Sequence, residues 1–178
     1  MQNYILISCF GIMLLVSCTK ESGKTYISPS FQDPPCATEL IKSDVRWTSM
    51  LPIYQDGDMI EYASGYYQCH DVQRDDIVIF DSAGKLIIKR VVGIPWDEWK
   101  YEDGKIIMNG IPLKNSEWRE YQIQSRMLSI YAKSYPTIPK DTYMIFGNRI
   151  DGTLDSSKFW LIAKQDIVGK VDTTKKKR

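Results

Sequence analysis

Short apolar runs, separated by turn-forming residues, follow one another along the chain from Leu40 onward. Runs of this length that are rich in Ile, Val, Tyr and Phe are typical of β-strands rather than of helices. The pattern therefore predicts strands over residues 58–60, 76–80, 86–92, 105–108, 142–146 and 166–171.

Two of the connections between these runs have the composition of hairpin turns. Ser82-Ala83-Gly84-Lys85 lies between two expected strands, and Asn109-Gly110 lies between one strand and the apolar residues 111–113. An Asn-Gly pair between apolar runs is the strongest short-range signal for a hairpin. Only residues 117–131 are a candidate helix, and their periodicity is ambiguous. The sequence predicts a mainly β fold.

The N-terminal residues follow a different pattern. Residues 4–16 are almost wholly apolar, and about 13 apolar residues are too few to span a bilayer but suit the centre of a signal peptide. Leu15-Val16-Ser17-Cys18 resembles a bacterial lipobox, which implies acylation of Cys18. We therefore expect a signal peptide of the lipoprotein type over residues 1–17. The alternative is a short uncleaved anchor, and both place the remainder outside the cytoplasm.

Composition divides the rest of the chain into three parts. Residues 18–39 are rich in polar residues, Gly and Pro and predict a flexible, lipid-anchored tether. Residues 40–171 are long enough for one domain with a core. Residues 172–178 end in Lys175-Lys176-Lys177-Arg178, a basic tail that is either solvated or in contact with anionic lipid. The net charge of +1 gives no electrostatic argument for binding nucleic acid.

The cysteines are consistent with export. If Cys9 belongs to the signal peptide and Cys18 is acylated, Cys36 and Cys69 remain as a possible disulfide pair. Such a bond would close a loop of about 33 residues, which is worth roughly 3–4 kcal/mol. Two unpaired buried thiols are the alternative. His70 beside Cys69 does not make a metal site, so we expect His70 at the surface and no metal or cofactor.

A serine and a lysine are the candidate catalytic pair. A serine hydroxyl needs a neighbouring base to act as a nucleophile, and His70 is the single histidine in the sequence. Lys89 lies in the apolar run 86–92, where burial would lower its pKa and let it accept the Ser49 proton. Arg90 stays protonated and points to the opposite face of the strand. The alternatives are a solvent-facing Lys89 and a Ser49 that merely begins a loop.

Several blocks, in order along residues 45–171, resemble the type I signal peptidases, the S26 family of Ser–Lys endopeptidases. The blocks are Ser49-Met50-Leu51-Pro52 with Gly57-Asp58, residues 74–80, residues 89–95, Asn109-Gly110, and Gly147-Asn148-Arg149 with Thr153, Asp155 and Ser156. The resemblance implies a core of antiparallel β-sheets, with Ser49 as nucleophile and Lys89 as general base.

The resemblance also implies supporting roles. Thr153 would orient the lysine amine, and Asp155 would support the site with Arg149, Lys158 or Arg90 as its cationic partner. The chain departs from the family pattern at three positions. Gly147 stands where an aspartate is usual, Ser157 where an arginine usually pairs with the aspartate, and Trp47 where a small residue or a hydroxyl completes the oxyanion hole.

The function implied by the resemblance is cleavage of exported precursor polypeptides after small residues, at a membrane of the bacterial envelope. The domain would be held there by its N-terminal lipid or short anchor, facing the periplasm or exterior. An alternative is a weak or inactive member that binds peptides or assists envelope assembly. A repressor-type autoprotease is a third hypothesis, but no DNA-binding domain fits before residue 45.

Overall fold

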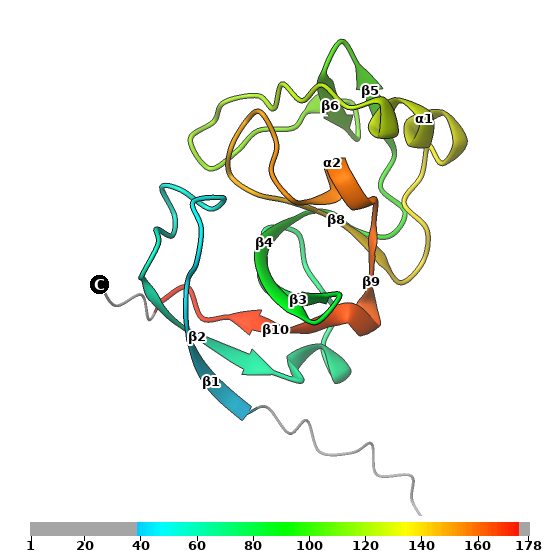
Figure 1. Cartoon of the computed structure of the whole chain (residues 1–178). Coiled ribbons are helices and arrows are strands. Elements are labelled where there is room, and N and C mark those ends of the chain that lie inside the picture. The colour runs from blue at the N-terminus through cyan, green and yellow to red at the C-terminus, as the bar shows by residue number, and fades with distance from the viewer. Residues whose placement is uncertain (1–38, 175–178) are drawn as a thin grey trace, which may run out of the picture. The chain divides into compact units, whose positions relative to one another are not determined.

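The computed structural model describes residues 39–174 (Figure 1). These residues form two antiparallel sheets and few short helices, which confirms the predicted mainly β fold. The larger sheet has the order β1-β2-β10-β3-β4-β8-β9 and the smaller one β5-β6-β7. The strands are β1 (Glu39–Asp44), β2 (Met59–Ser64), β3 (Ile77–Ser82), β4 (Lys85–Gly93), β5 (Trp99–Glu102), β6 (Lys105–Met108), β7 (Ile111–Pro112), β8 (Thr142–Phe146), β9 (Ile162–Ala163) and β10 (Ile167–Val171). The helices are α1 (Arg126–Ser134) and α2 (Ser156–Phe159), with 3-10 turns η1 (Tyr66–Gln68) and η2 (Lys164–Asp166).

The predicted strands all exist. β6 and β8 have the predicted bounds, and β4 extends beyond them at both ends. β2, β3 and β10 begin one residue later than predicted, and β2 and β3 also continue further. Both hairpins are present, because β3 pairs with β4 and β6 pairs with β7. β1, β5 and β9 were not predicted. Glu39, which we assigned to the tether, is the first residue of β1.

The candidate helix over 117–131 is only partly correct, because α1 covers Arg126–Ser134. The side chain of Asn115 accepts hydrogen bonds from the backbone of Glu117 and Arg119, and Trp118 has a φ of 61°. A left-handed residue and a side chain that captures backbone N–H groups both interrupt a helix. The helix begins only after Ser125, whose hydroxyl accepts from the amide of Leu128.

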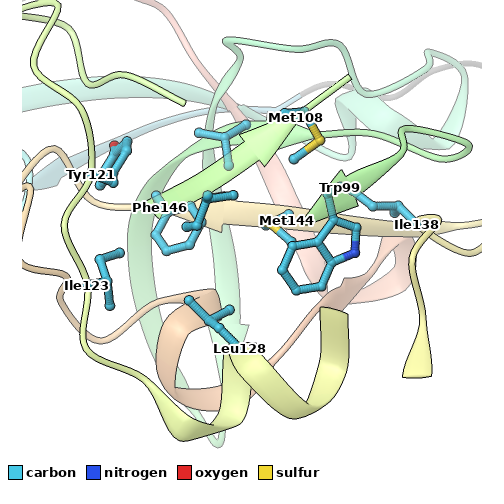
Figure 2. Packing of buried hydrophobic residues seen from close by; sticks show 10 residues of the cluster. Trp99, Met108, Tyr121, Ile123, Leu128, Ile138, Met144 and Phe146 are labelled. Carbon is cyan, nitrogen blue, oxygen red and sulfur yellow. The ribbon is translucent and has the colours of Figure 1, made fainter. Parts of the chain in front are cut away.

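Three clusters of buried apolar side chains form the core. The one in Figure 2 lies among β5, β6, β8 and α1, and Trp99 is its largest member. A second packs Met50 and Tyr54 against residues of β2, β3 and β4, such as Ile60 and Ile79. This second cluster anchors the chain around Ser49 to the main sheet.

The residues before β2 form a long hairpin. β1 and β2 pair from Glu39 opposite Ser64 to Asp44 opposite Met59. The ladder continues with a hydrogen bond of 2.8 Å from the amide of Val45 to the carbonyl of Asp58. Residues 46–57 are thus the loop of this hairpin (Figure 1). Ser49 belongs to this loop by its position in the sequence.

Several predictions concern residues outside the described range. These are the signal peptide, the tether up to residue 38 with Cys18 and Cys36, and the basic residues 175–178. Among residues 39–174, no helix combines the length and apolar character that crossing a membrane requires.

Candidate active site

Ser49 and Lys89 meet at one end of the β1–β2 hairpin. The Nζ atom of Lys89 lies 2.8 Å from the Oγ atom of Ser49 and 2.9 Å from the carbonyl oxygen of Ile88. Lys89 occupies the middle of β4, between β3 and β8, while Ser49 comes from the hairpin loop. Two residues that are 40 positions apart are thus placed at hydrogen-bond distance.

The environment of Lys89 changes its protonation. The residue is only 2% exposed, and burial lowers its pKa from 10.5 to about 8. The carboxylate of Asp155 acts in the opposite direction and raises this pKa. Burial dominates because a charged amine loses its hydration in an apolar surrounding. About a tenth of such a group is neutral at pH 7.

The turn that carries Ser49 is fixed at several points. The amide of Asn148 donates to the carbonyl oxygen of Ser49 at 2.7 Å, and the Asn148 side chain donates to the carbonyl oxygen of Leu51 at 2.7 Å. Met50, between them, is buried. Before Ser49 in the chain, the amide of Trp47 donates to the carboxylate of Asp56. These contacts restrict where the Ser49 hydroxyl can lie.

Asp155 is completely buried and has different partners from the three cations expected from the sequence. Its carboxylate accepts from the amide and hydroxyl of Ser157, from those of Thr153, and from the amide of Gly147. It also caps the N-terminus of α2, where a negative charge is favourable. Hydroxyl and amide donors therefore take the place of the expected guanidinium or ammonium partner.

Two of the three expected cations have side-chain contacts elsewhere, and the third is exposed. Arg90 forms an ion pair with Asp75 and donates to the carbonyl oxygen of Lys114. Arg149 pairs with Asp151 at the surface, and the side chain of Lys158 is exposed. The side chains of Lys89 and Arg90 have separate partners, in agreement with their adjacent positions on one strand.

Thr153 reaches the site but does not bind the lysine amine. It lines the same cavity as Lys89, and its hydroxyl donates to Asp155 at 2.5 Å. In the part of the chain that the structure describes, no hydrogen bond joins Thr153 to Lys89. Thr153 therefore contacts Asp155 instead of the lysine amine, which differs from the direct contact that we expected.

Gly147 stands where the resemblance suggested an aspartate, and the packing explains why. A Cβ atom at this position would lie 2.5 Å from the Thr153 hydroxyl and 2.7 Å from the Ser49 carbonyl oxygen. Real Cβ atoms do not approach other atoms so closely, and the Ser49 carbonyl belongs to the backbone and cannot swing aside. An aspartate does not fit while the Ser49 turn keeps this position.

A cavity of about 740 Å³ opens beside the pair. The segment from Ser43 to Ser49 and the segment from Lys85 to Lys89 both line it. Apolar side chains of Ile60, Tyr62 and Ile79 also line it. Trp47 also lines the cavity, and this residue is 79% exposed. Its backbone amide donates to the carboxylate of Asp56.

The remaining predicted positions are away from the pair. His70 is exposed and stacks on Tyr66. Cys69 is disulfide-bonded, and since the other three cysteines precede residue 39, its partner lies outside the described residues. Residues 39–174 contain no group of three or more His, Cys, Asp or Glu side chains arranged to hold a metal ion.

Two supporting residues were missed from the sequence. Asn148 was noted only as part of a block, although it is 2% exposed and holds the Ser49 turn. Tyr121 is buried, and its hydroxyl donates to the carbonyl oxygen of Gly147 at 2.6 Å. Neither role has a local signal, because both depend on contacts between segments far apart in the chain.

Several known proteins are similar in sequence to this chain. The model of the family "Signal peptidase, peptidase S26" matches residues 37–174. The chain is 27% identical over 139 residues to signal peptidase IB of Staphylococcus aureus strain COL, covering 71% of this chain and 73% of the relative. It is 26% identical over 132 residues to signal peptidase I of Leptolyngbya laminosa, covering 68% of this chain and 62% of the relative. A crystal structure of a signal peptidase I from Enterococcus faecalis V583 aligns with a TM-score of 0.42 and 24% identity, over 58% of this chain and 98% of that one.

Proposed function

The chain belongs to the S26 family of signal peptidases, and from this premise we propose that it is a serine endopeptidase whose Ser49–Lys89 pair cleaves exported precursor polypeptides after small residues. The observation that carries the proposal is the 2.8 Å separation of Lys89 Nζ and Ser49 Oγ. A nucleophile and its base within hydrogen-bond reach are the geometric signature of covalent catalysis.

The reaction follows from this geometry. The neutral amine of Lys89 takes the proton of the Ser49 hydroxyl as Oγ attacks the scissile carbonyl carbon. The tetrahedral intermediate collapses to an ester on Ser49, and the leaving amine receives the proton from the Lys89 ammonium. Lys89 then deprotonates a water molecule, which hydrolyses the ester and regenerates Ser49. The lowered pKa of Lys89, about 8, supports both proton transfers near neutral pH.

The backbone N–H of Ser49 is the donor that we assign to the oxyanion of the intermediate. A second donor from residue 47 has less support, because the Trp47 amide already binds Asp56 and its side chain is largely exposed. Loss of one such donor costs about 10²–10³ in rate. The proposed enzyme is therefore slower than one with a complete oxyanion hole.

The substrate would bind as an added strand. β4 pairs with β3 from Lys85 to Arg90, but β8 pairs with β4 only from Arg90 onward. The other edge of residues 85–89 faces the cavity and is not paired within the large sheet. An extended peptide can complete such an edge with main-chain hydrogen bonds, and this places its scissile bond beside Ser49.

The proposal includes the location of the enzyme. We infer that acylated Cys18 holds the domain at a membrane of the bacterial envelope and that the domain faces the periplasm or exterior. The apolar residues 4–16 and the lipobox-like residues 15–18 support this anchor. Two acyl chains, as in a mature bacterial lipoprotein, are sufficient for firm attachment.

A second candidate function is peptide binding or envelope assembly without efficient cleavage. The contacts of Trp47 and Thr153 favour it, because neither residue supplies the group expected of it at the site. This alternative retains the cavity and the open strand edge, and it assigns no chemistry to Ser49.

Cleavage of a precursor with an Ala-X-Ala site separates the two candidates. The purified full chain is incubated with the precursor beside Ser49→Ala and Lys89→Ala, and product is measured by mass spectrometry. We expect product from the wild type and from neither variant. Equal cleavage by all three would refute the catalytic pair. Absence of cleavage combined with binding of the precursor to all three would favour the binding function.

A further inference from the structure

The cavity beside Ser49 extends well beyond the catalytic pair. Its volume is about 740 Å³, of which the side chain of one small residue fills only a minor part. Both Lys85 and Lys89 line it, and four residues of a β-strand span about 13 Å. A polypeptide that is cut beside Ser49 can therefore place further side chains in the same cavity.

Buried residues of the large sheet form part of the cavity lining. Ile60 and Tyr62 of β2 and Ile79 of β3 line it and belong to the second core cluster. Ile60 and Tyr62 are two positions apart on one strand, so their side chains point to the same face of the sheet. Each of the three residues is at most 4% exposed. These side chains are thus fixed by packing, and a substrate would meet a preformed surface.

The ring of Tyr62 is held in place by a glycine. β10 lies between β2 and β3, and its Gly169 pairs with Ser64 on one side and with Ile79 on the other. A Cβ atom at Gly169 would lie 3.0 Å from the Cδ2 atom of Tyr62. The glycine therefore leaves room for the ring to pack against β10, which restricts where the Tyr62 hydroxyl can lie.

The Tyr62 hydroxyl is free to bind a ligand. Within residues 39–174 it takes part in no hydrogen bond. In the same range, Arg90 Nε is the one fully buried polar side-chain atom without a partner, so the Tyr62 hydroxyl remains accessible to solvent. The cavity that Tyr62 lines provides this access. A buried tyrosine usually has a partner for its hydroxyl, and here a molecule in the cavity can supply one.

We propose that Tyr62 is a specificity-determining residue, whose hydroxyl selects a substrate side chain with a hydrogen-bonding group over an apolar side chain of the same shape. An apolar side chain would displace water from the hydroxyl and leave it unpaired, whereas a hydroxyl or amide group would replace that water. This inference rests on the proposed function, because it requires an exported precursor to bind along the cavity.

The alternation of an extended peptide locates the substrate position. The residue after which the chain is cut lies beside Ser49, and the peptide continues along the open edge of residues 85–89. Successive side chains of a strand point to opposite sides. The side chain two residues before the cut residue therefore points into the cavity together with that of the cut residue. In an Ala-X-Ala site this position is the first alanine, and we expect Tyr62 to act there.

Cleavage of matched precursors tests the selection. The first alanine of Ala-X-Ala is replaced by Thr or Val, and in a second pair by Asn or Leu, so that each pair differs mainly in hydrogen-bonding capacity. The ratio of kcat/KM for the polar over the apolar member is measured for the wild type and for Tyr62→Phe. We expect this ratio to fall by about tenfold in Tyr62→Phe for the pair that reaches the hydroxyl. A change of less than about twofold for both pairs would overturn the proposal.

Tyr143→Phe is the matched control. Tyr143 is also a buried tyrosine of the large sheet, but it packs in a different core cluster from Tyr62. Its loss of a hydroxyl should leave the ratio unchanged. A fall of equal size in both variants would overturn the assignment of the selection to Tyr62.

Urea unfolding separates selection from a structural role of the hydroxyl. Because the Tyr62 hydroxyl has no partner within residues 39–174, Tyr62→Phe should unfold at the same urea concentration as the wild type. Tyr121→Phe loses the hydrogen bond to the Gly147 carbonyl oxygen and should unfold at a lower concentration. A Tyr62→Phe variant as destabilised as Tyr121→Phe would show that the hydroxyl serves the fold, and the proposal would fail.

Binding distinguishes failure of this inference from failure of the proposed function. The same precursors are titrated by calorimetry into Ser49→Ala and into the double variant Ser49→Ala with Tyr62→Phe. A preference for the polar member that is lost in the double variant supports Tyr62, even if the wild type cleaves nothing and the proposed function fails. Equal preferences in the two variants would overturn the role of Tyr62, whether or not the wild type cleaves.

Discussion

The backbone amide of Asn148 donates a hydrogen bond of 2.7 Å to the carbonyl oxygen of Ser49. The Asn148 side chain extends the contact in two directions, to the carbonyl oxygen of Leu51 and to the amide of Ser116. One buried residue thus joins the Ser49 turn to the segment that follows the small sheet. The position of the Ser49 side chain is therefore restricted by this contact as well as by the hairpin that carries the residue.

Asn148→Ala is expected to lower kcat by about 10², because a displacement of about 1 Å at a reacting group has an effect of this size. The variant should also lose about 1–3 kcal/mol of stability, since the Leu51 carbonyl and the Ser116 amide lose their hydrogen-bond partner and each such bond is worth about 0.5–1.5 kcal/mol. Steady-state kinetics and urea unfolding measure the two effects.

Asn109→Ala is the matched control for this variant. The Asn109 side chain also joins two segments, through Asp97 and the amide of Glu98, but it belongs to the small-sheet hairpin. It should lower stability and leave kcat almost unchanged. Equal losses of kcat in both variants would show that Asn148 acts through general stability alone.

Gly147→Ala should displace the Ser49 turn. The added methyl group would lie 2.7 Å from the Ser49 carbonyl oxygen and 2.5 Å from the Thr153 hydroxyl. Overpacking of this kind costs about 1–3 kcal/mol, and we expect kcat/KM to fall by about 10² or more. Gly110→Ala is the control, because Gly110 has a φ of 80° and no atom within 4 Å of the added Cβ. It should lower stability only, and normal activity of Gly147→Ala would disprove the predicted clash.

The sequence predicted the buried strands well and the marginal ones poorly. β4 and β8 lie inside the large sheet and are mostly apolar, so their composition alone defines them. β1 and β9 are short or exposed and form only because a neighbouring strand is present. β5 had a usable signal, since Trp99 and Tyr101 alternate with charged residues before the turn at Asp103-Gly104.

The pairing of Ser49 with Lys89 could be proposed from the sequence, whereas the partners of Asp155 could not. The family resemblance implied a cation for Asp155, and a buried carboxylate is costly without compensation. The compensation instead comes from local donors two residues away on either side, Thr153 and Ser157, and from the N-terminus of α2. A four-residue helix has no periodicity by which the sequence could reveal this arrangement.

The cleavage rate should depend on the ionisation of Lys89. Because only the neutral amine accepts the Ser49 proton, kcat/KM should rise with pH and level off above its pKa, about 8. The Asp155 carboxylate raises this pKa, so Asp155→Asn should move the rising limb to lower pH while lowering its plateau. Asp151→Asn, at a surface ion pair with Arg149, should leave the profile in place. If the rising limb of the pH profile does not move in Asp155→Asn, the Asp155 carboxylate does not raise the pKa of Lys89.

Lys89→Met should abolish cleavage and yet stabilise the protein at neutral pH. The pKa of Lys89 is lower in the folded state, about 8, than its ordinary value of 10.5, so the unfolded chain binds this proton more tightly. Stability of the wild type therefore rises between about pH 8 and pH 10.5, because over this range the unfolded chain still holds a proton that the folded protein has lost. Methionine has no charge to bury, and at pH 7 we expect it to add about 1–3 kcal/mol. That advantage should disappear above about pH 10.5, and urea unfolding at several pH values measures it.

Lys85→Met, at an exposed position of the same strand, should show no such pH dependence. A Lys89→Met variant less stable than the wild type at pH 7 would mean that the Ser49 and Ile88 contacts of the amine outweigh the cost of burying its charge.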